Sequence, residues 1–223
     1  MSDRKPSPFL RTEATRAALV RAALDLFGAK GFEATSTREI ATAAKVNIAA
    51  IAYHFGGKEG LRAACADFVV ATIRQIFAAA AGEASAIEAL TPAGARDALA
   101  RTIAGLIDGI VVRGEARPIV RFVMREMFEP SAAFERLYAA IGPMHGRACA
   151  LWSRASGAPA ESETTRLAVF SLIGQLIYFR LARPAVLRRM EWSDIGPAEG
   201  AAIKRLVVGN LDAALALARK TNP

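Results

Sequence analysis

Apolar residues recur at steps of three and four along almost all of this 223-residue chain. This spacing places them on one face of an α-helix. No segment shows sustained alternation of β-branched residues with Asn-Gly or Asp-Gly turns, the pattern that favours a β-sheet. The sequence therefore predicts an all-α protein.

Turn-forming residues divide the predicted helices into two groups. Breaks are expected at 28–35, 45–47, 55–58, 82–92, 113–118, 129–131, 157–162 and 182–197. Three short helices come first and several longer ones follow, one of which Gly142-Pro143 is expected to kink or break. The change in helix length indicates an N-terminal domain over residues 12–72 and a C-terminal domain over residues 73–223.

The composition narrows the class of protein and of partner. Apolar residues make up 53% of the chain and charged residues 22%, so a folded core is expected rather than disorder. The net charge of the chain is +8. Residues 1–62 carry 10 basic and 6 acidic residues, so half of the positive charge excess lies on less than a third of the chain. A polyanionic partner is compatible with this charge but is not required by it.

Neither a membrane span nor a metal site is expected. The longest clean apolar run, 167–179, is shorter than the roughly 20 residues that cross a bilayer. The first residues lack the apolar core of a secretory signal, so a cytoplasmic location is expected. Cys65, Cys149, His54 and His145 provide too few ligands for a metal cluster, and no cofactor is expected. Both cysteines are interpreted as small, buried apolar groups.

The N-terminal domain begins with two predicted helices. The first has an apolar face at positions 19, 20, 22, 23, 26 and 27, and Gly31 suits the left-handed cap that ends it. Ser36 and Glu39 have the three-residue spacing of a capping box at the start of a second helix. That helix is too short to be stable alone, so its apolar positions Ile40, Ala41 and Ala44 are expected to pack on the first.

A tight turn, Lys45-Val46-Asn47, leads into a third predicted helix, for which Asn47 is a good N-cap. The positions expected to pack inward are Ile48, Ile51 and Phe55, and those expected to be exposed are Ala49, Ala50, Tyr53 and His54. Two short helices joined by a tight turn can place the second in the major groove of DNA. The sequence thus predicts a helix-turn-helix at about 36–55.

Further motifs follow in a fixed order between Thr12 and about Ala71. They are Ala23 and Phe27, Gly31-Phe32, Ala34-Thr35-Ser36, Ile40-Ala41, Val46-Asn47, His54-Phe55 and Lys58-Glu59. In this order and spacing they resemble the N-terminal domain of the TetR family of transcriptional regulators. The resemblance implies a homodimer in which each subunit places its third helix in the major groove of a palindromic operator in double-stranded DNA.

The resemblance also assigns roles by position. A phosphate would be bound by Ser36 and Thr37 at the start of the second helix. The residues that would face base edges are Asn47, Ile48, Ala49 and Ala50. Those that would hold the DNA backbone are Tyr53, His54 and Lys58. Most family members have glycine where this chain has Lys45. A left-handed lysine there would cost on the order of 1 kcal/mol, so either a phosphate contact offsets this cost or the turn differs from that of the family. The usual tyrosine position holds Ala52, with Tyr53 next to it.

The C-terminal domain carries a second set of motifs. They are Arg121-Phe122-Val123-Met124-Arg125-Glu126-Met127-Phe128-Glu129-Pro130, Phe134-Leu137-Tyr138 and Gly174-Gln175. Together they resemble the C-terminal domain of the YbiH-type (CecR-like) branch of TetR regulators. The resemblance implies a dimer interface on two long apolar helices, 162–179 and 197–220, which would form a four-helix bundle with their copies. Gly174 inside such a helix suggests close helix approach.

The resemblance further implies a ligand pocket among the helices of the C-terminal domain. Candidate lining residues are Phe122, Arg125, Met127, Tyr138, His145, Trp152, Gln175 and Tyr178, which combine aromatic walls with polar anchors. For any one of them, a role in the core is the alternative. Arg117, Arg121 and Arg125 form a helical stripe that either anchors an anion or pairs with Glu126 or Glu129.

The resulting hypothesis is a dimeric, ligand-responsive transcriptional regulator, most often a repressor in this family. An unknown small-molecule effector would tilt the helix that begins near Leu61 and so change the separation of the two DNA readers. One alternative is an all-α ligand-binding protein or enzyme, although no catalytic motif is evident. Another is a redox-sensing regulator that uses Cys65 and Cys149, although their alanine neighbours indicate unreactive thiols.

Overall fold

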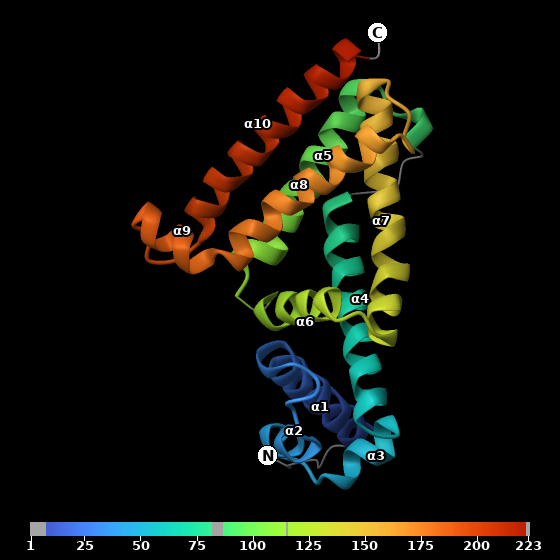
Figure 1. Ribbon diagram of the computed structural model, residues 1–223, viewed down its shortest axis with the longest axis vertical. Coiled ribbons are helices and arrows are strands. Elements are labelled where there is room, and N and C mark those ends of the chain that lie inside the picture. Colours follow the sequence, from blue (N-terminus) through green and yellow to red (C-terminus); the bar gives the residue numbers. More distant parts are fainter. Residues whose placement is uncertain (1–7, 82–86, 115, 222–223) are drawn as a thin grey trace, which may run out of the picture. The chain divides into compact units, whose positions relative to one another are not determined.

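A computed structural model describes residues 8–81, 87–114 and 116–221 of the chain, and all regular structure in these ranges is helical (Figure 1). The elements are α1 (Pro8–Lys30), α2 (Thr37–Ala44), α3 (Ala49–Phe55), α4 (Lys58–Ala81), a 3-10 turn η1 (Ile87–Ala89), α5 (Pro92–Leu106), a π-helical segment η2 (Ile107–Val112), α6 (Ala116–Phe128), α7 (Ala132–Ser156), α8 (Glu163–Leu181), α9 (Arg183–Met190) and α10 (Pro197–Thr221). The all-α prediction is confirmed.

The chain divides into two compact units. The first unit consists of Met1–Ala71 and Pro118–Ala139, and the second of Thr72–Arg117 and Ala140–Pro223. Most of α6 and the start of α7 therefore belong to the same unit as α1, α2 and α3. Local sequence patterns had indicated no association of α6 with these helices. The predicted functional boundary after residue 72 stays a prediction.

The core of the first unit draws on every helix in it. Its buried side chains include Leu19, Ala23 and Phe27 of α1, Ile40 of α2, Ile51 of α3, Leu61 and Val69 of α4, Phe122 of α6 and Leu137 of α7. The ring centroid of Phe27 lies 5.3 Å from that of Phe32 and 6.5 Å from that of Phe122. A Cβ on Gly28 would lie 3.0 Å from Cβ of Arg121, so this glycine allows α1 and α6 to approach closely.

The second unit has its own core, in which η2 is central. Buried apolar residues of α5, η2, α7, α8, α9 and α10 form one cluster that includes Leu99, Ile107, Trp152, Leu176 and Val207. The π-helical segment follows α5 without a break, and no sequence signal had indicated it. A Cβ on Gly109 would lie 3.0 Å from Ile76, and one on Gly200 would lie 2.6 Å from Val112. Both glycines therefore permit close packing on or beside η2.

Two of the predicted breaks lie within helical structure. The helix α7 continues through Gly142-Pro143 to Ser156, so this pair does not break the helix, and the alternative of a kink stays a prediction. Because Ala139 is exposed, the carbonyl oxygen that Pro143 leaves without a donor can be solvated. The predicted break at 182–197 contains α9, which has Pro184 in its first turn and buries only Val186. Its polar, proline-containing sequence resembles a loop, although Pro is well tolerated at a helix start.

Among the described helices, no single one combines the length and apolarity of a membrane span. One pair of successive helices, Glu163–Leu181 and Arg183–Met190, has sufficient combined length and apolarity but is bent by 76°.

Candidate nucleic-acid interface

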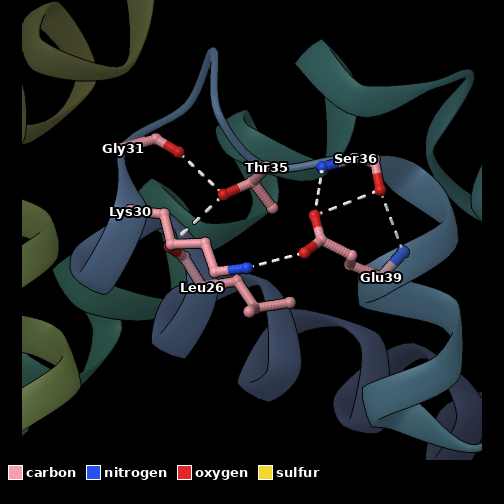
Figure 2. A network of polar contacts seen from close by, with 6 residues as sticks. All are labelled: Leu26, Lys30, Gly31, Thr35, Ser36 and Glu39. Carbon is pink, nitrogen blue, oxygen red and sulfur yellow. Dashed lines mark hydrogen bonds and ion pairs between the residues drawn. The ribbon is translucent and has the colours of Figure 1, made fainter.

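The start of α2 is held by the predicted capping box (Figure 2). The Ser36 hydroxyl accepts from the Glu39 amide at 3.2 Å, and the Glu39 carboxylate accepts from the Ser36 amide at 3.0 Å. Lys30 at the end of α1 donates to the same carboxylate at 2.6 Å. The hydrogen bonds from Lys30 and Ser36, together with the lysine charge, lower the pKa of Glu39 from 4.5 to about 2. The ion pair between Lys30 and Glu39 thus links the capping box of α2 to the end of α1.

The turn between α2 and α3 contains a left-handed lysine, which is the first of the two alternatives that the missing glycine left open. Lys45 has φ 57° and ψ 41°, and it is the C-cap of α2. Its amide donates to Thr42 O at 3.1 Å, and the Val46 amide donates to Ala41 O at 3.0 Å. These bonds satisfy the last carbonyls of α2 and reverse the chain within three residues. The side chain of Lys45 is exposed.

The next helix begins one residue later than Asn47 capping predicts. The helix α3 is defined from Ala49, and Ile48 already has helical dihedral angles. The side-chain oxygen of Asn47 nevertheless accepts from the Ala49 amide at 2.9 Å. This bond satisfies one of the amides that a helix start leaves free.

The outward face of α3 is mainly apolar. Ile51 is 2% exposed, but Ile48 is 49% exposed and Tyr53 is 83% exposed, so the expected inward packing of Ile48 is wrong. Ile48 is the N-cap of α3, so it lies before the helical turn whose inward face Ile51 occupies. Ala49 and Ala52 are exposed, and Ala50 is partly buried.

The far end of α3 is attached to α1. Arg16 Nη1 donates to the carbonyl of His54 at 3.5 Å, and its guanidinium lies 4.9 Å from the centre of the Phe55 ring. The rings of Tyr53 and His54 meet edge to face at 4.9 Å. The Arg16 contacts hold the C-terminal end of α3 to α1, while Tyr53 remains exposed.

All ten predicted DNA contacts lie on one continuous stretch of the first unit, from the start of α2 to the start of α4. Exposed side chains are those of Ser36, Lys45, Asn47, Ile48, Ala49 and Tyr53, and partly buried ones are those of Thr37, Ala50, His54 and Lys58. Their contacts with DNA stay predictions. The geometry they require is present: an exposed short helix that is joined to α2 by a tight turn and held to α1 by Arg16.

A network behind this surface was missed by sequence reasoning. The Lys58 ammonium and the Arg62 guanidinium lie 4.1 and 4.4 Å from the centre of the Phe32 ring. Arg62 also donates to Glu126 of α6 through Nε at 2.8 Å and Nη2 at 3.0 Å, and Ser131 donates to the same carboxylate at 2.6 Å. Glu126 therefore pairs with Arg62 of α4 and not with the arginine stripe on its own helix.

The proposed effector residues are divided between the two units. Phe122 is buried beside Phe27, and Arg125 Nη2 donates to Ala29 O at 3.3 Å, both in the first unit. Met127 and Tyr138, also in the first unit, are 48% and 61% exposed. Their role in effector binding stays a prediction.

The other four candidates lie in the second unit. Trp152 is in its core, Tyr178 is 60% exposed, and Gln175 accepts from Asn210 at 2.7 Å. The His145 ring stacks on Phe170 at 4.0 Å, and its Nδ1 lies 3.6 Å from Sγ of Cys149. Nε2 of His145 is buried without a hydrogen-bond partner among the described residues. His145 is thus the candidate with an unused polar atom.

The two cysteines have the environment of structural thiols. Both are buried. Burial and the nearby Glu126 charge raise the pKa of Cys65, and burial followed by Glu161 raises that of Cys149. A raised pKa reduces the thiolate fraction that redox chemistry needs. This environment speaks against the redox-sensing alternative.

Comparisons with known proteins agree with this geometry. Residues 19–65 match the family model described as bacterial regulatory proteins, tetR family, and residues 95–217 match that of the HTH-type transcriptional dual regulator CecR, C-terminal domain. Over 211 residues the chain is 31% identical to the HTH-type transcriptional dual regulator CecR of Shigella flexneri, covering 93% of this chain and 94% of that protein.

Solved structures show the same fold at low identity. A TetR-family transcriptional regulator from Streptomyces coelicolor has a TM-score of 0.66 and 18% identity, covering 93% of this chain and 97% of its own. AibR in complex with isovaleryl coenzyme A and operator DNA has a TM-score of 0.65 and 18% identity, covering 87% of this chain and 96% of its own.

Proposed function

We propose a function from the premise that this chain belongs to the TetR family of transcriptional regulators and carries a CecR-type C-terminal domain. The protein would repress transcription as a homodimer bound to a palindromic operator. A small molecule bound to the C-terminal domain would change its affinity for DNA. The observation that carries the proposal is the exposed outer face of α3, held by the capping box of α2, the Lys45 turn and Arg16. We infer that the protein acts on cytoplasmic DNA.

The dimer would form through an exposed apolar surface on the second unit. On α8, the exposed residues Leu167, Phe170, Gly174, Tyr178 and Leu181 repeat at steps of three and four, and α10 adds Leu206 and Leu217. The Asn210–Gln175 hydrogen bond joins the two helices. A Cβ on Gly174 would meet no atom within 4 Å, so any close approach at Gly174 involves a second chain. Contiguous exposed apolar surface of this kind is typical of a protein interface.

Gly174→Glu tests the dimer without disturbing the subunit core. Because the site is open, the variant should fold, yet a carboxylate at a two-fold interface would lie near its own copy and prevent association. Sedimentation should show a dimer for the wild type and a monomer for the variant. Ala93→Glu, at an exposed position in the first turn of α5, is the matched control and should remain dimeric. A dimeric Gly174→Glu protein would contradict this interface.

The effector would bind in the second unit, with His145 as a polar anchor. A buried nitrogen without a partner is costly, so a ligand that supplied a hydrogen bond to Nε2 would gain from it. The solved structure of AibR, a structural neighbour, is a complex with isovaleryl coenzyme A and operator DNA, which supports a small molecule as the class of effector. The helix α4 continues from the first unit into the second in sequence, so it is the proposed carrier of the signal.

Selection from randomised duplex DNA at near-physiological salt tests the central claim. The wild-type protein should enrich an inverted repeat, because two copies of α3 read two half-sites. The selected duplex then serves to screen small molecules for release. His145→Phe should bind the same duplex but respond less to a releasing compound. Weak, salt-sensitive binding without an enriched sequence would contradict sequence-specific regulation.

A further inference from the structure

The outward side of α3 offers methyl groups where a DNA reader usually offers hydrogen bonds. Ile48 and Ala49 are exposed at the start of the helix, and Ala50 is partly exposed beside them. The only amide side chain there is Asn47, whose oxygen is occupied by the Ala49 amide. Asn47 therefore retains its side-chain NH2 as a donor, while one of the two lone pairs of its oxygen is already engaged within the chain.

Base recognition in the major groove follows from what each base edge presents. Guanine and adenine are read by paired hydrogen bonds, and cytosine by an acceptor, none of which a hydrocarbon side chain can supply. Thymine alone presents a C5-methyl group, which gains from contact with an apolar side chain. The N-terminal residues of a recognition helix are the ones that approach base edges.

We propose that this protein selects its operator through thymine methyl groups, which Ile48, Ala49 and Ala50 contact in each half-site. The inference rests on the proposed function, since it requires α3 to enter the major groove. The long polar side chains beside the face then position the protein on the phosphates. Lys45 extends from the turn and Tyr53 is exposed further along the helix.

Replacement of thymine by deoxyuridine isolates the methyl group. Deoxyuridine keeps every hydrogen-bonding atom of thymine and lacks only the C5-methyl. Each thymine of the selected operator is replaced singly, and binding is measured by fluorescence anisotropy with the full-length protein. At the contacted positions the affinity should fall about threefold to fivefold, the loss expected for one buried methyl group. Thymines outside the half-sites are the internal control and should change little.

A protein variant then assigns the effect to its side chain. In Ala49→Gly and Ala50→Gly the methyl group that contacts thymine is absent. For these variants, the affinity for the thymine duplex divided by the affinity for the deoxyuridine duplex should approach one at the corresponding position. Because each ratio compares two duplexes with the same variant, any loss of helix stability cancels. Persistence of the full ratio in both variants and in Ile48→Ala would overturn the assignment to these residues.

The outcomes separate this inference from the proposed function. One outcome of selection is an enriched inverted repeat in which no thymine is sensitive to replacement by deoxyuridine, and another is a repeat in which the half-sites contain no thymine. Either result overturns methyl recognition but does not contradict the proposed function as a transcriptional regulator. Readout confined to guanines and lost in Arg38→Ala would also overturn it, because Arg38 is an exposed donor on α2. Failure to enrich any repeat instead contradicts the proposed function itself.

Discussion

Arg62 of α4 and Glu126 of α6 form a two-pronged ion pair between residues 64 positions apart in the chain. Their side chains are only 13% and 3% exposed. The pair is extended by Ser131, which donates to Glu126, and by Phe32, whose ring lies against Arg62. It therefore fastens α6 to the start of α4 and to the loop between α1 and α2.

Replacing one partner of this pair should be strongly destabilising. Glu126→Ala leaves the Arg62 guanidinium buried without its carboxylate, and such losses are about 3–5 kcal/mol. Urea unfolding of the wild type and the variant measures the difference. The double variant Arg62→Met with Glu126→Leu should recover most of the stability, because an apolar pair needs no compensating charge.

An exposed ion pair provides the control for that result. Arg96 and Asp212 have side chains that are 30% and 48% exposed, and they also make two hydrogen bonds. Asp212→Asn should cost no more than about 1 kcal/mol, since water replaces the lost contact. Equal losses for Glu126→Ala and Asp212→Asn would show that burial of the Arg62–Glu126 pair is unimportant.

Local signals in the sequence were sufficient for the helix-turn-helix. The capping box of Ser36 and Glu39 depends on residues three apart, within a single turn of helix. The N-cap of α2 and the burial of Ile40 and Ala41 could therefore be predicted. The left-handed conformation of Lys45 was suggested only by the glycine that most family members have at this position.

Long-range packing could not be predicted in the same way. The pattern around Glu126 shows arginines on its own helix, so pairing within α6 was one expected outcome, whereas the actual partner lies on α4. The approach of α6 to α1 at Gly28 likewise has no signal in either segment alone. For the effector site, aromatic residues at helical spacing are compatible with core and pocket alike, and Phe122 and Trp152 are buried packing residues.

Lys45→Gly should stabilise the protein and weaken DNA binding. The residue has φ 57°, a region where a side chain costs about 1–2 kcal/mol and glycine costs nothing comparable. The free energy of unfolding should rise by about 1 kcal/mol in urea, allowing for the greater flexibility of glycine in the unfolded chain. If Lys45 binds a phosphate, the slope of log affinity against log salt should decrease by about one.

Lys45→Ala separates the charge from the backbone effect. It keeps a Cβ in the left-handed conformation, so it should lose the same salt dependence without the gain in stability. A glycine variant no more stable than the alanine variant would contradict strain at this position.

Glu39 should make stability depend on acid pH. Its pKa is about 2 in the folded protein against an ordinary 4.5, so the unfolded chain binds the proton more readily. The stabilisation is complete above pH 4.5 and is lost as the pH falls from 4.5 towards 2. Glu39→Gln should have a lower Tm than the wild type at pH 6, and the difference should shrink below pH 4.5 and vanish near pH 2.

Lys30→Met identifies the source of that shift. The hydrogen bond from Lys30 is its largest cause, so without the lysine the pKa of Glu39 should move back towards 4.5. A carboxyl titration followed by NMR measures this directly. An unchanged titration of Glu39 in Lys30→Met would assign the shift to Ser36 alone.

Thr35 tests whether the loop before α2 depends on a hydrogen bond or on packing. The residue is 1% exposed, and its hydroxyl donates to Gly31 O at 2.7 Å, with Leu26 O at 3.3 Å (Figure 2). Thr35→Val keeps the shape but leaves the carbonyls without this donor, at a cost of about 1–3 kcal/mol. Thr35→Ser keeps the donor and removes one methyl, at a cost of about 0.8 kcal/mol. Urea unfolding should rank serine above valine, and the reverse order would show that methyl packing holds this loop.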